Sequence, residues 1–274
     1  MMAQSDVQNP NPGDNSTVLK IDELTKFFGG LRAVHDFDVH IKQGELVGLI
    51  GPNGAGKTTI FNMITGIYPV SEGTIAFKGQ DITDMPSHEI TQLGIGRTFQ
   101  RIRVFRNLTV LDNVRVAYHP HADYGMFDGI LRLGRFGRGE REMTERAQEF
   151  LSVFGMEDLQ DTLATNLPYG AQRRLEIARA LATEPDLLLL DEPAAGMNPQ
   201  EIVELMELIH FIRDRFNLTI LLIEHQMRVV MGICEWMTVI DFGQIIARGT
   251  PKEIQNNPRV IEAYLGSQAT RMVD

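Results

Sequence analysis

Hydrophobic residues in this chain follow two strand-like patterns. Between residues 18 and 41 apolar and polar positions alternate, which predicts half-buried antiparallel strands that turn at residues 27–30. Elsewhere, short unbroken apolar runs predict strands that are covered on both faces. These runs lie at residues 46–50, 187–190 and 218–223.

Apolar residues at helical spacing separate the strands. At residues 199–215 they recur every three or four positions and form one stripe. In a second predicted helix, at residues 168–182, the stripe leaves Arg173, Arg174 and Arg179 on the polar side. Further elements are expected at residues 73–79 (strand), 86–93, 110–116 and 140–154 (helices), 236–246 (hairpin) and 251–265 (two short helices). Strands that alternate with helices indicate an α/β fold.

A glycine-rich loop follows the apolar run at residues 46–50. Residues 51–58 match G-x-x-x-x-G-K-[ST], a loop in which glycines let successive backbone N–H groups face one oxyanion. Lys57 adds a positive charge at the β- and γ-phosphates, Thr58 offers a hydroxyl to Mg²⁺, and the next helix begins there. The predicted nucleotide-binding residues here are Gly51, Pro52, Asn53, Gly54, Ala55, Gly56, Lys57, Thr58 and Thr59.

Polar residues end two of the buried runs. Asp191 and Glu192 follow residues 187–190, and the carboxyl edge of a parallel sheet is where α/β proteins bind ligands. Asp191 is placed to hold Mg²⁺ through its water shell, and Glu192 to take a proton from an attacking water. The alternative is that both acids cap the next helix. His225, after the third run, is a candidate γ-phosphate contact or a structural histidine.

Composition narrows the class of partner. The net charge of −10 argues against a general nucleic-acid binder. The single cysteine, Cys234, is expected to be a small core residue. Residues 1–17 are predicted to be a disordered polar tail without the pattern of a signal peptide, and no run approaches the roughly 20 apolar residues that cross a bilayer. Any membrane role therefore requires partner subunits.

A basic segment interrupts the helical region before residue 140. Its arginines, spaced three residues apart, are typical of a solvated face and less often of a contact for anionic lipid or an acidic partner. They are Arg132, Arg135, Arg138 and Arg141. His119 and His121 lie nearby, but no cluster of Cys, Asp or further His accompanies them, so a metal site is rejected.

The order of the motifs resembles that of the ATP-binding subunits of ABC transporters. The phosphate loop is followed by Gln100, the helix start at residues 167–174, the acidic pair and His225. Within this superfamily the chain is most similar to the branched-chain amino acid importer ATPases. The stretches that carry this closer similarity are residues 97–100, 167–179, 191–199 and 249–266.

This resemblance implies a P-loop ABC ATPase with a mixed RecA-like core sheet, an antiparallel β subdomain and an inserted helical subdomain. The insertion would span about residues 101–175 of a single nucleotide-binding domain at residues 18–266. A loose tail would follow at residues 267–274.

It also implies a function for each candidate residue. Lys57 and Thr58 would hold phosphate and Mg²⁺, and Asp191 would assist the metal through water. Gln100 would sense the metal and link to the membrane partner, and Phe28 would stack on adenine.

The chemical step would fall to Glu192 as general base, with His225 holding the γ-phosphate and polarising the water. A second subunit would close each ATP site with its signature segment. In this chain that segment is Leu167, Pro168, Tyr169, Gly170, Ala171 and Gln172.

The signature departs from the usual Leu-Ser-Gly-Gly-Gln. Only Leu167 and Gly170 are kept, and Pro168 removes both a hydroxyl and a backbone donor. Asn198 also stands where the family usually has Asp, and Phe28 where it more often has Tyr. We therefore hypothesise that the site this signature completes hydrolyses ATP slowly, in a heterodimer with a sister ATPase.

The implied partners are two permease subunits, a sister ATP-binding subunit or a second copy of this chain, and an external solute-binding protein. They would place the chain at the cytoplasmic face of the membrane, without nucleic acid. The alternatives are a soluble ABC ATPase of DNA repair or translation and the ATPase of an exporter or lipid transporter. The first usually carries coiled-coil insertions, zinc cysteines or tandem ATPase domains, which this sequence lacks.

Overall fold

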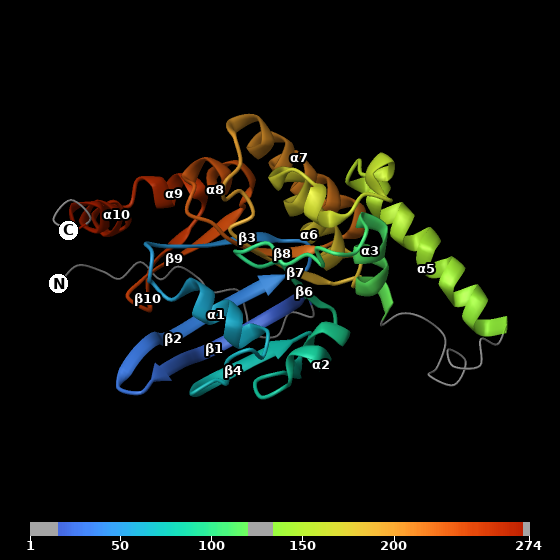
Figure 1. Ribbon diagram of the computed structural model, residues 1–274. Helices are drawn as coiled ribbons and strands as arrows, with labels where there is room; N and C mark the ends of the chain where they lie inside the picture. The colour runs from blue at the N-terminus through green and yellow to red at the C-terminus, as the bar shows by residue number, and fades with distance from the viewer. Residues whose placement is uncertain (1–15, 120–133, 271–274) are drawn as a thin grey trace, which may run out of the picture.

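The computed structural model describes residues 16–119 and 134–270. The described chain forms two β-sheets and a set of helices (Figure 1). Three predicted features lie wholly or largely outside the described residues: the N-terminal tail, the positions of His121 and Arg132, and the end of the C-terminal tail.

The smaller sheet is antiparallel. It consists of β1 (Thr17–Phe28), β2 (Leu31–Lys42), β4 (Glu72–Phe77) and β5 (Gln80–Asp81), in the order β2-β1-β4-β5. The larger sheet consists of β3 (Leu46–Ile50), β6 (Ile95–Arg97), β7 (Leu187–Asp191), β8 (Thr219–Ile223), β9 (Trp236–Asp241) and β10 (Gln244–Gly249), in the order β10-β9-β3-β8-β7-β6. Only the β9–β10 pair in it is antiparallel. The predicted combination of a mixed core sheet and an antiparallel sheet is confirmed.

The helices fall between and around these strands. They are α1 (Lys57–Ile64), α2 (Ser87–Gln92), α3 (Val110–Tyr118), α5 (Gly134–Val153), α6 (Tyr169–Leu181), α7 (Pro199–Phe216), α8 (Met227–Ile233), α9 (Pro251–Gln255) and α10 (Pro258–Thr270), with short 3₁₀ helices at Glu157–Leu159 and Ala164–Asn166. Among the described residues, no helix is both long and apolar enough to cross a membrane.

The larger sheet is buried on both faces, as its apolar runs predict. In β7, Leu187 and Leu189 join a core with α1 and the antiparallel sheet, whereas Leu188 and Leu190 join a core with α6, α7 and α8. Successive side chains of a strand point to opposite faces, so a strand with two buried faces needs an unbroken apolar sequence. Figure 1 shows the antiparallel sheet below this central sheet and most helices above it.

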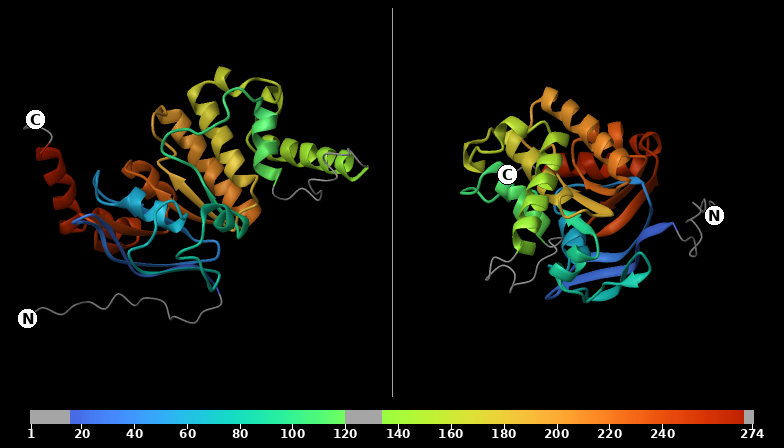
Figure 2. Two further views of the ribbon diagram at one scale, coloured as in Figure 1. Left: turned by 60° about the horizontal axis from the view of Figure 1, so that its bottom comes forward. Right: turned by 90° about the vertical axis from the view of Figure 1, so that its right-hand side faces the viewer.

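Helices α3, α5 and α6 pack together at one end of the molecule (Figure 2). Thr109 caps α3 by accepting a hydrogen bond from the Asp112 N–H at 3.0 Å. Aromatic contacts join α3 and α5 to each other and to the core, because the Phe150 ring lies 6.4 Å from Tyr118 and 6.1 Å from Phe216. This group occupies the part of the sequence where the helical insertion is expected.

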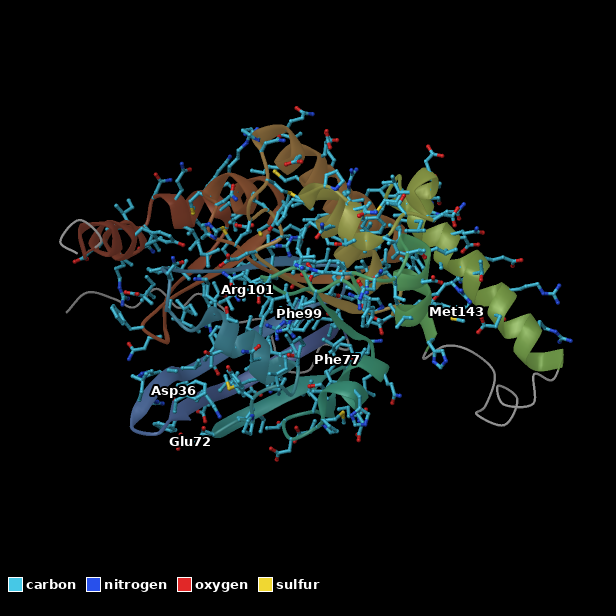
Figure 3. The ribbon with its side chains drawn as sticks, in the orientation of Figure 1. Asp36, Glu72, Phe77, Phe99, Arg101 and Met143 are labelled. Carbon is cyan, nitrogen blue, oxygen red and sulfur yellow. The ribbon has the colours of Figure 1, made fainter. Side chains whose placement is uncertain are left out.

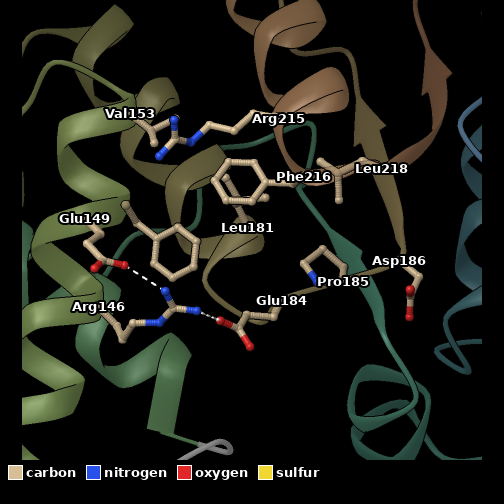
Figure 4. Close-up of a pocket in the computed structure, with 11 residues that line it drawn as sticks. Arg146, Glu149, Val153, Leu181, Glu184, Pro185, Asp186, Arg215, Phe216 and Leu218 are labelled. Atoms are coloured by element: carbon tan, nitrogen blue, oxygen red, sulfur yellow. Dashed lines mark hydrogen bonds and ion pairs between the residues drawn. The ribbon is translucent and has the colours of Figure 1, made fainter.

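A cavity of about 280 Å³ marks the junction of this helical group with the core (Figure 4). Part of its lining is apolar, and two ion pairs of Arg146 on α5 close one side of it. Arg146 contacts Glu149 at 2.7 Å and Glu184, beyond α6, at 2.6 Å. Glu184 has a left-handed backbone with φ 47°. The Arg146–Glu184 pair therefore links α5 to the segment that enters β7.

Two expectations about the helices differ from the structure. The Arg173 side chain is 0% exposed, although the helical stripe places it on the polar side. It is buried because the loop before α3 covers it and supplies carbonyl partners. The second difference is the last helix, which continues to Thr270 instead of ending near residue 265.

Candidate functional site

Three segments that carry predicted site residues leave the larger sheet at the same edge. Strands β3, β8 and β7 are parallel neighbours in which Leu49 pairs with Ile223, and Ile223 pairs with Asp191. Their carboxyl ends are therefore in register. The phosphate loop, the acidic pair and the segment with His225 follow these ends and lie together.

The phosphate loop has a backbone that only glycine adopts at low cost. Gly51, Gly54 and Gly56 have φ of 154°, 81° and 106°. A Cβ at Gly51 would lie 2.0 Å from the Ile240 carbonyl oxygen, and one at Gly56 2.8 Å from that of Ala33. The carbonyls of Ile240 in β9 and Ala33 in β2 thus leave room only for glycine at these two positions of the loop.

Helix α1 begins at Lys57, directly after the loop, and no side chain caps its first N–H groups. Such a helix start attracts anions. Of the other predicted loop residues, Pro52 and Ala55 are buried, Thr59 is half-buried, and Asn53 and Thr58 are exposed. The Thr58 hydroxyl is therefore accessible to a ligand or metal.

The Lys57 ammonium is buried within the loop. It donates hydrogen bonds to the carbonyl oxygens of Gly51 at 2.7 Å and Pro52 at 2.8 Å. Burial lowers the pKa of Lys57, and the nearby carboxylates of Glu192 and Asp191 oppose that shift. The lysine charge and the acidic pair therefore act on the same small volume.

Asp191 combines a satisfied oxygen with an unsatisfied one. Its side chain is 2% exposed, and Oδ2 accepts a hydrogen bond from the Arg97 guanidinium at 3.2 Å. Its buried Oδ1 has no hydrogen-bond partner among the described residues. Burial raises the pKa of Asp191, and Arg97 opposes the rise. A buried carboxylate oxygen without a hydrogen-bond partner fits Mg²⁺ or a water bound to it.

Glu192 meets two other predicted residues. Its Oε2 accepts a hydrogen bond from the Gln100 amide at 2.9 Å and lies 3.6 Å from Nδ1 of His225. The Glu192 backbone has φ 48°, which is rare for a residue with a side chain. Its N–H donates to the Ile223 carbonyl at 2.8 Å, which holds this conformation. Unfavourable backbone geometry of this kind is concentrated at functional sites.

Glu224 is a structural member of the site that the sequence pattern did not single out. Its side chain is 0% exposed. One carboxylate oxygen accepts the Ala194 N–H at 3.0 Å, and the other accepts those of His225 at 2.9 Å and Gln226 at 3.0 Å. Glu224 thus fixes the chain around His225 and joins it to the segment after Glu192. Its position directly after an apolar run was the available signal.

The signature segment faces a different part of the chain. Leu167 is buried, whereas Pro168 and Tyr169 are exposed. A Cβ at Gly170 would lie 2.8 Å from Glu201 Oε1, and one at Gly196 would lie 3.1 Å from the Tyr169 ring. Ala171 is buried, and Gln172 donates to the carbonyl of Leu167 at 2.8 Å. The segment therefore contacts the region around the start of α7.

Phe28 ends β1 and is 43% exposed. Its ring lies edge-on to Tyr68 at 5.4 Å, with the Lys26 ammonium 5.2 Å from its centre. It belongs to the β1–β2 hairpin, whose Ala33 carbonyl lies against Gly56. This places an accessible aromatic on the hairpin that adjoins the phosphate loop.

Comparison with known proteins gives consistent matches over nearly the whole chain. Residues 34–195 match the model of the family described as ABC transporter, and residues 244–270 match that of the branched-chain amino acid ATP-binding cassette transporter. The high-affinity branched-chain amino acid transport ATP-binding protein LivG of Escherichia coli K12 is 47% identical over 91% of this chain and 98% of its own. BraF of Pseudomonas aeruginosa, with the same description, is 44% identical over 91% and 98%.

A solved structure agrees with these matches. The crystal structure of MJ1267 in its ADP conformation, an ATP-binding cassette of an ABC transporter, superposes with a TM-score of 0.78 at 30% identity. The match covers 91% of this chain and 99% of that one.

Proposed function

The chain belongs to the ABC transporter family of ATP-binding domains, and from this premise we propose that it hydrolyses ATP to power an importer of branched-chain or related amino acids. One observation supports the chemical part above all. Glu192, Gln100 and His225 meet through one carboxylate oxygen at the sheet edge that also carries the phosphate loop. The amino-acid class rests on the LivG and BraF relatives and on the match at residues 244–270.

The phosphates of ATP would lie in the loop before α1. Loop N–H groups and Lys57 would hold the β- and γ-phosphates, and Thr58 and Asp191 would hold Mg²⁺, Asp191 through water. When bound, Mg²⁺ would neutralise part of the charge on these phosphates. Phe28 would stack on the adenine from the neighbouring hairpin.

Glu192 would accept a proton from the attacking water as its oxygen approaches the γ-phosphorus. His225, 3.6 Å from the same carboxylate, would contact the γ-phosphate and orient that water. Gln100 would complete the arrangement. It would contact the bound metal, so that the loop on which it lies responds to the presence of the metal. The left-handed backbone at Glu192 would fix the direction of the base.

A second ATP-binding subunit would complete each site. The exposed Tyr169 and the half-buried Gly170 at the start of α6 would lie against the γ-phosphate of the opposing ATP. Because Pro168 supplies neither a hydroxyl nor a backbone donor there, we infer a slower site on this side of a heterodimer.

Membrane partners would dock beside the Gln100 loop. A cavity of about 660 Å³ lies there, and Phe105 and Val116 are 46% and 47% exposed at its border. Arg103 and Arg179 stack over Phe99 and Phe105 and give the cavity a basic, aromatic wall. We propose that cytoplasmic segments of the two permeases bind here, with an external protein delivering the solute.

The test uses the complete transporter in vesicles. Glu192→Gln should keep ATP binding but lower ATP turnover and amino-acid uptake on the order of 10²- to 10⁴-fold, as expected for loss of a general base. Unchanged turnover would refute the assignment of Glu192. Making the matched change in the sister subunit tests the asymmetry, because equal losses from the two changes would contradict it.

A further inference from the structure

The loop that carries Gln100 has little regular structure of its own. It follows β6, and Phe99 and Arg101 lie on it near the centre of the molecule (Figure 3). The polar groups of a buried backbone need partners. Between residues 99 and 103, the partners described for these groups come from one helix, α6, which also carries the signature segment.

Arg173 holds two successive carbonyls of the loop. Its Nη1 donates to the Phe99 carbonyl at 2.8 Å, and its Nη2 donates to the Gln100 carbonyl at 3.0 Å. Nη1 also contacts Glu176 Oε2 at 2.7 Å, and Nη2 lies 3.5 Å from the hydroxyl of Tyr169. The planar guanidinium thus joins the loop to a residue of the signature segment.

Glu176 holds the N–H groups of the same loop. Its Oε1 accepts hydrogen bonds from Arg103 at 3.0 Å and Phe99 at 3.3 Å. The Glu176 and Arg173 side chains are 4% and 0% exposed. Burial raises the pKa of Glu176, and the partners in the loop and Arg173 oppose the rise. Together, the two side chains satisfy donors and acceptors from residue 99 to residue 103.

A buried ion pair alone is weak evidence for a stabilising role, because desolvation offsets much of the attraction. Most hydrogen bonds of these two residues, however, are made to the backbone of a loop distant in sequence. Arg173 directly follows the signature segment, and Glu176 lies about one turn further along the same helix. Any displacement of α6 would therefore move the Gln100 loop with it.

We propose that Arg173 and Glu176 are positioning residues that couple the signature segment to Gln100. When the signature segment closes on the ATP of the opposing subunit, α6 sets the contact between Gln100 and Glu192 in this subunit. The two ATP sites would thus be linked through one helix. This proposal rests on the proposed role of Gln100 in hydrolysis.

A double-mutant cycle in the vesicle-embedded transporter tests the link. Arg173→Lys keeps a charge for Glu176 but cannot hold two carbonyls in a fork, and Gln100→Ala removes the side chain acted upon. We expect each change to lower kcat for ATP about 10-fold or more, with little change in KM. The double variant should be about as slow as the slower single one, because both changes break one linkage.

Two further variants separate positioning from folding. Arg174→Met alters the adjacent arginine of α6, for which no loop contact is described, and should retain the wild-type rate. Arg173→Met combined with Glu176→Met replaces the pair with apolar side chains and should fold, yet show the same loss of kcat as Arg173→Lys. A wild-type rate in this pair variant would overturn the proposal.

The remaining outcomes are equally distinct. Losses that multiply in the Arg173→Lys, Gln100→Ala double variant would show that Arg173 does not act through Gln100. If Gln100→Ala alone leaves turnover unchanged, the role of Gln100 fails, and the coupling fails with it. If Glu192→Gln also leaves turnover unchanged, the proposed hydrolytic site is itself wrong.

Discussion

At the scale of single residues, the site depends on a backbone conformation that most side chains avoid. Glu192 has φ 48°, and a non-glycine residue in such a region costs on the order of 1–3 kcal/mol. The hydrogen bond from its N–H to Ile223 maintains this conformation. The strain is thus located at the residue that we propose as the general base.

Replacing Glu192 by glycine or by alanine separates the cost of the backbone conformation from the effect of losing the carboxylate. Both changes remove the carboxylate, but only alanine keeps a Cβ at positive φ. We therefore expect Glu192→Gly to be more stable than Glu192→Ala by about 1 kcal/mol, measured by urea denaturation. The same two changes at Glu207, exposed on α7, should show the opposite order. Finding the alanine variant more stable at both positions would contradict the strain.

A second residue-scale prediction concerns Asp191 and pH. Burial raises its pKa above 3.8 despite Arg97, so the folded protein holds this proton more tightly than the unfolded chain does. Ionisation of Asp191 therefore costs stability as the pH rises from 3.8 through the raised pKa. Asparagine cannot ionise. Without nucleotide, the stability of Asp191→Asn relative to wild type should increase over that range and then level off.

A pH series of denaturation curves measures this difference for Asp191→Asn. Asp186→Asn is a useful comparison, because that carboxylate is more exposed and pairs with Lys78. A relative stability of the Asp191 variant that declines with rising pH would mean that Arg97 outweighs desolvation.

At the scale of elements, the phosphate loop is shaped by its neighbours. A Cβ at Gly51 would meet the Ile240 carbonyl at 2.0 Å, whereas one at Gly54 would meet nothing within 4 Å. Both glycines have positive φ, so alanine is strained at either. We expect Gly51→Ala to lose at least about 2 kcal/mol more stability than Gly54→Ala, because only the former also clashes. Thermal unfolding of the two variants without nucleotide measures this difference. Similar transition temperatures would contradict the prediction and show that β9 can shift to accommodate the Cβ at residue 51.

The elements themselves were largely predictable from the sequence. Four consecutive leucines specified that β7 is covered on both faces, and the glycine pattern located the phosphate loop. The partners of Arg173 could not be predicted, because hydrophobic periodicity marks apolar residues and gives no sign of an arginine that binds a distant loop. The role of Glu224 could not be predicted either. In the sequence it looks like any acidic residue at the end of a strand, and the three N–H groups that bind its carboxylate come together only in the folded chain.

At the scale of the whole molecule, the cavity of about 660 Å³ proposed as the permease-binding groove lies between the sheet core and the helical group. Its border combines apolar side chains with Arg103 and Arg179, so a partner helix with apolar and acidic residues would complement it. Arg179 also donates to the Arg103 carbonyl and thereby orders this border. Docking at this place would act directly on the loop that carries Gln100.

Replacing Phe105 by aspartate tests this surface. An exposed acid in place of the ring should weaken co-purification with the permeases at least about 10-fold, while ATP binding by the isolated subunit is retained. Phe211→Asp is the matched control, since that ring is 49% exposed on α7 and does not line the groove. Equal losses from both changes would indicate a general effect on solubility, and no loss from Phe105→Asp would place the permeases elsewhere.

The two carbonyls that Lys57 already holds have a consequence for selectivity. These bonds use two of the three N–H donors of the ammonium. A bound molecule therefore gains most if it offers an anionic oxygen to the third donor or replaces the neutral carbonyls with charged oxygens. A polyphosphate tail offers the ammonium several anionic oxygens, whereas adenosine or a monophosphate offers few or none at that depth. The phosphate loop would thus favour polyphosphates over nucleotides with fewer phosphates without any contact to the base. Recognition of the purine would be left to another part of the nucleotide site.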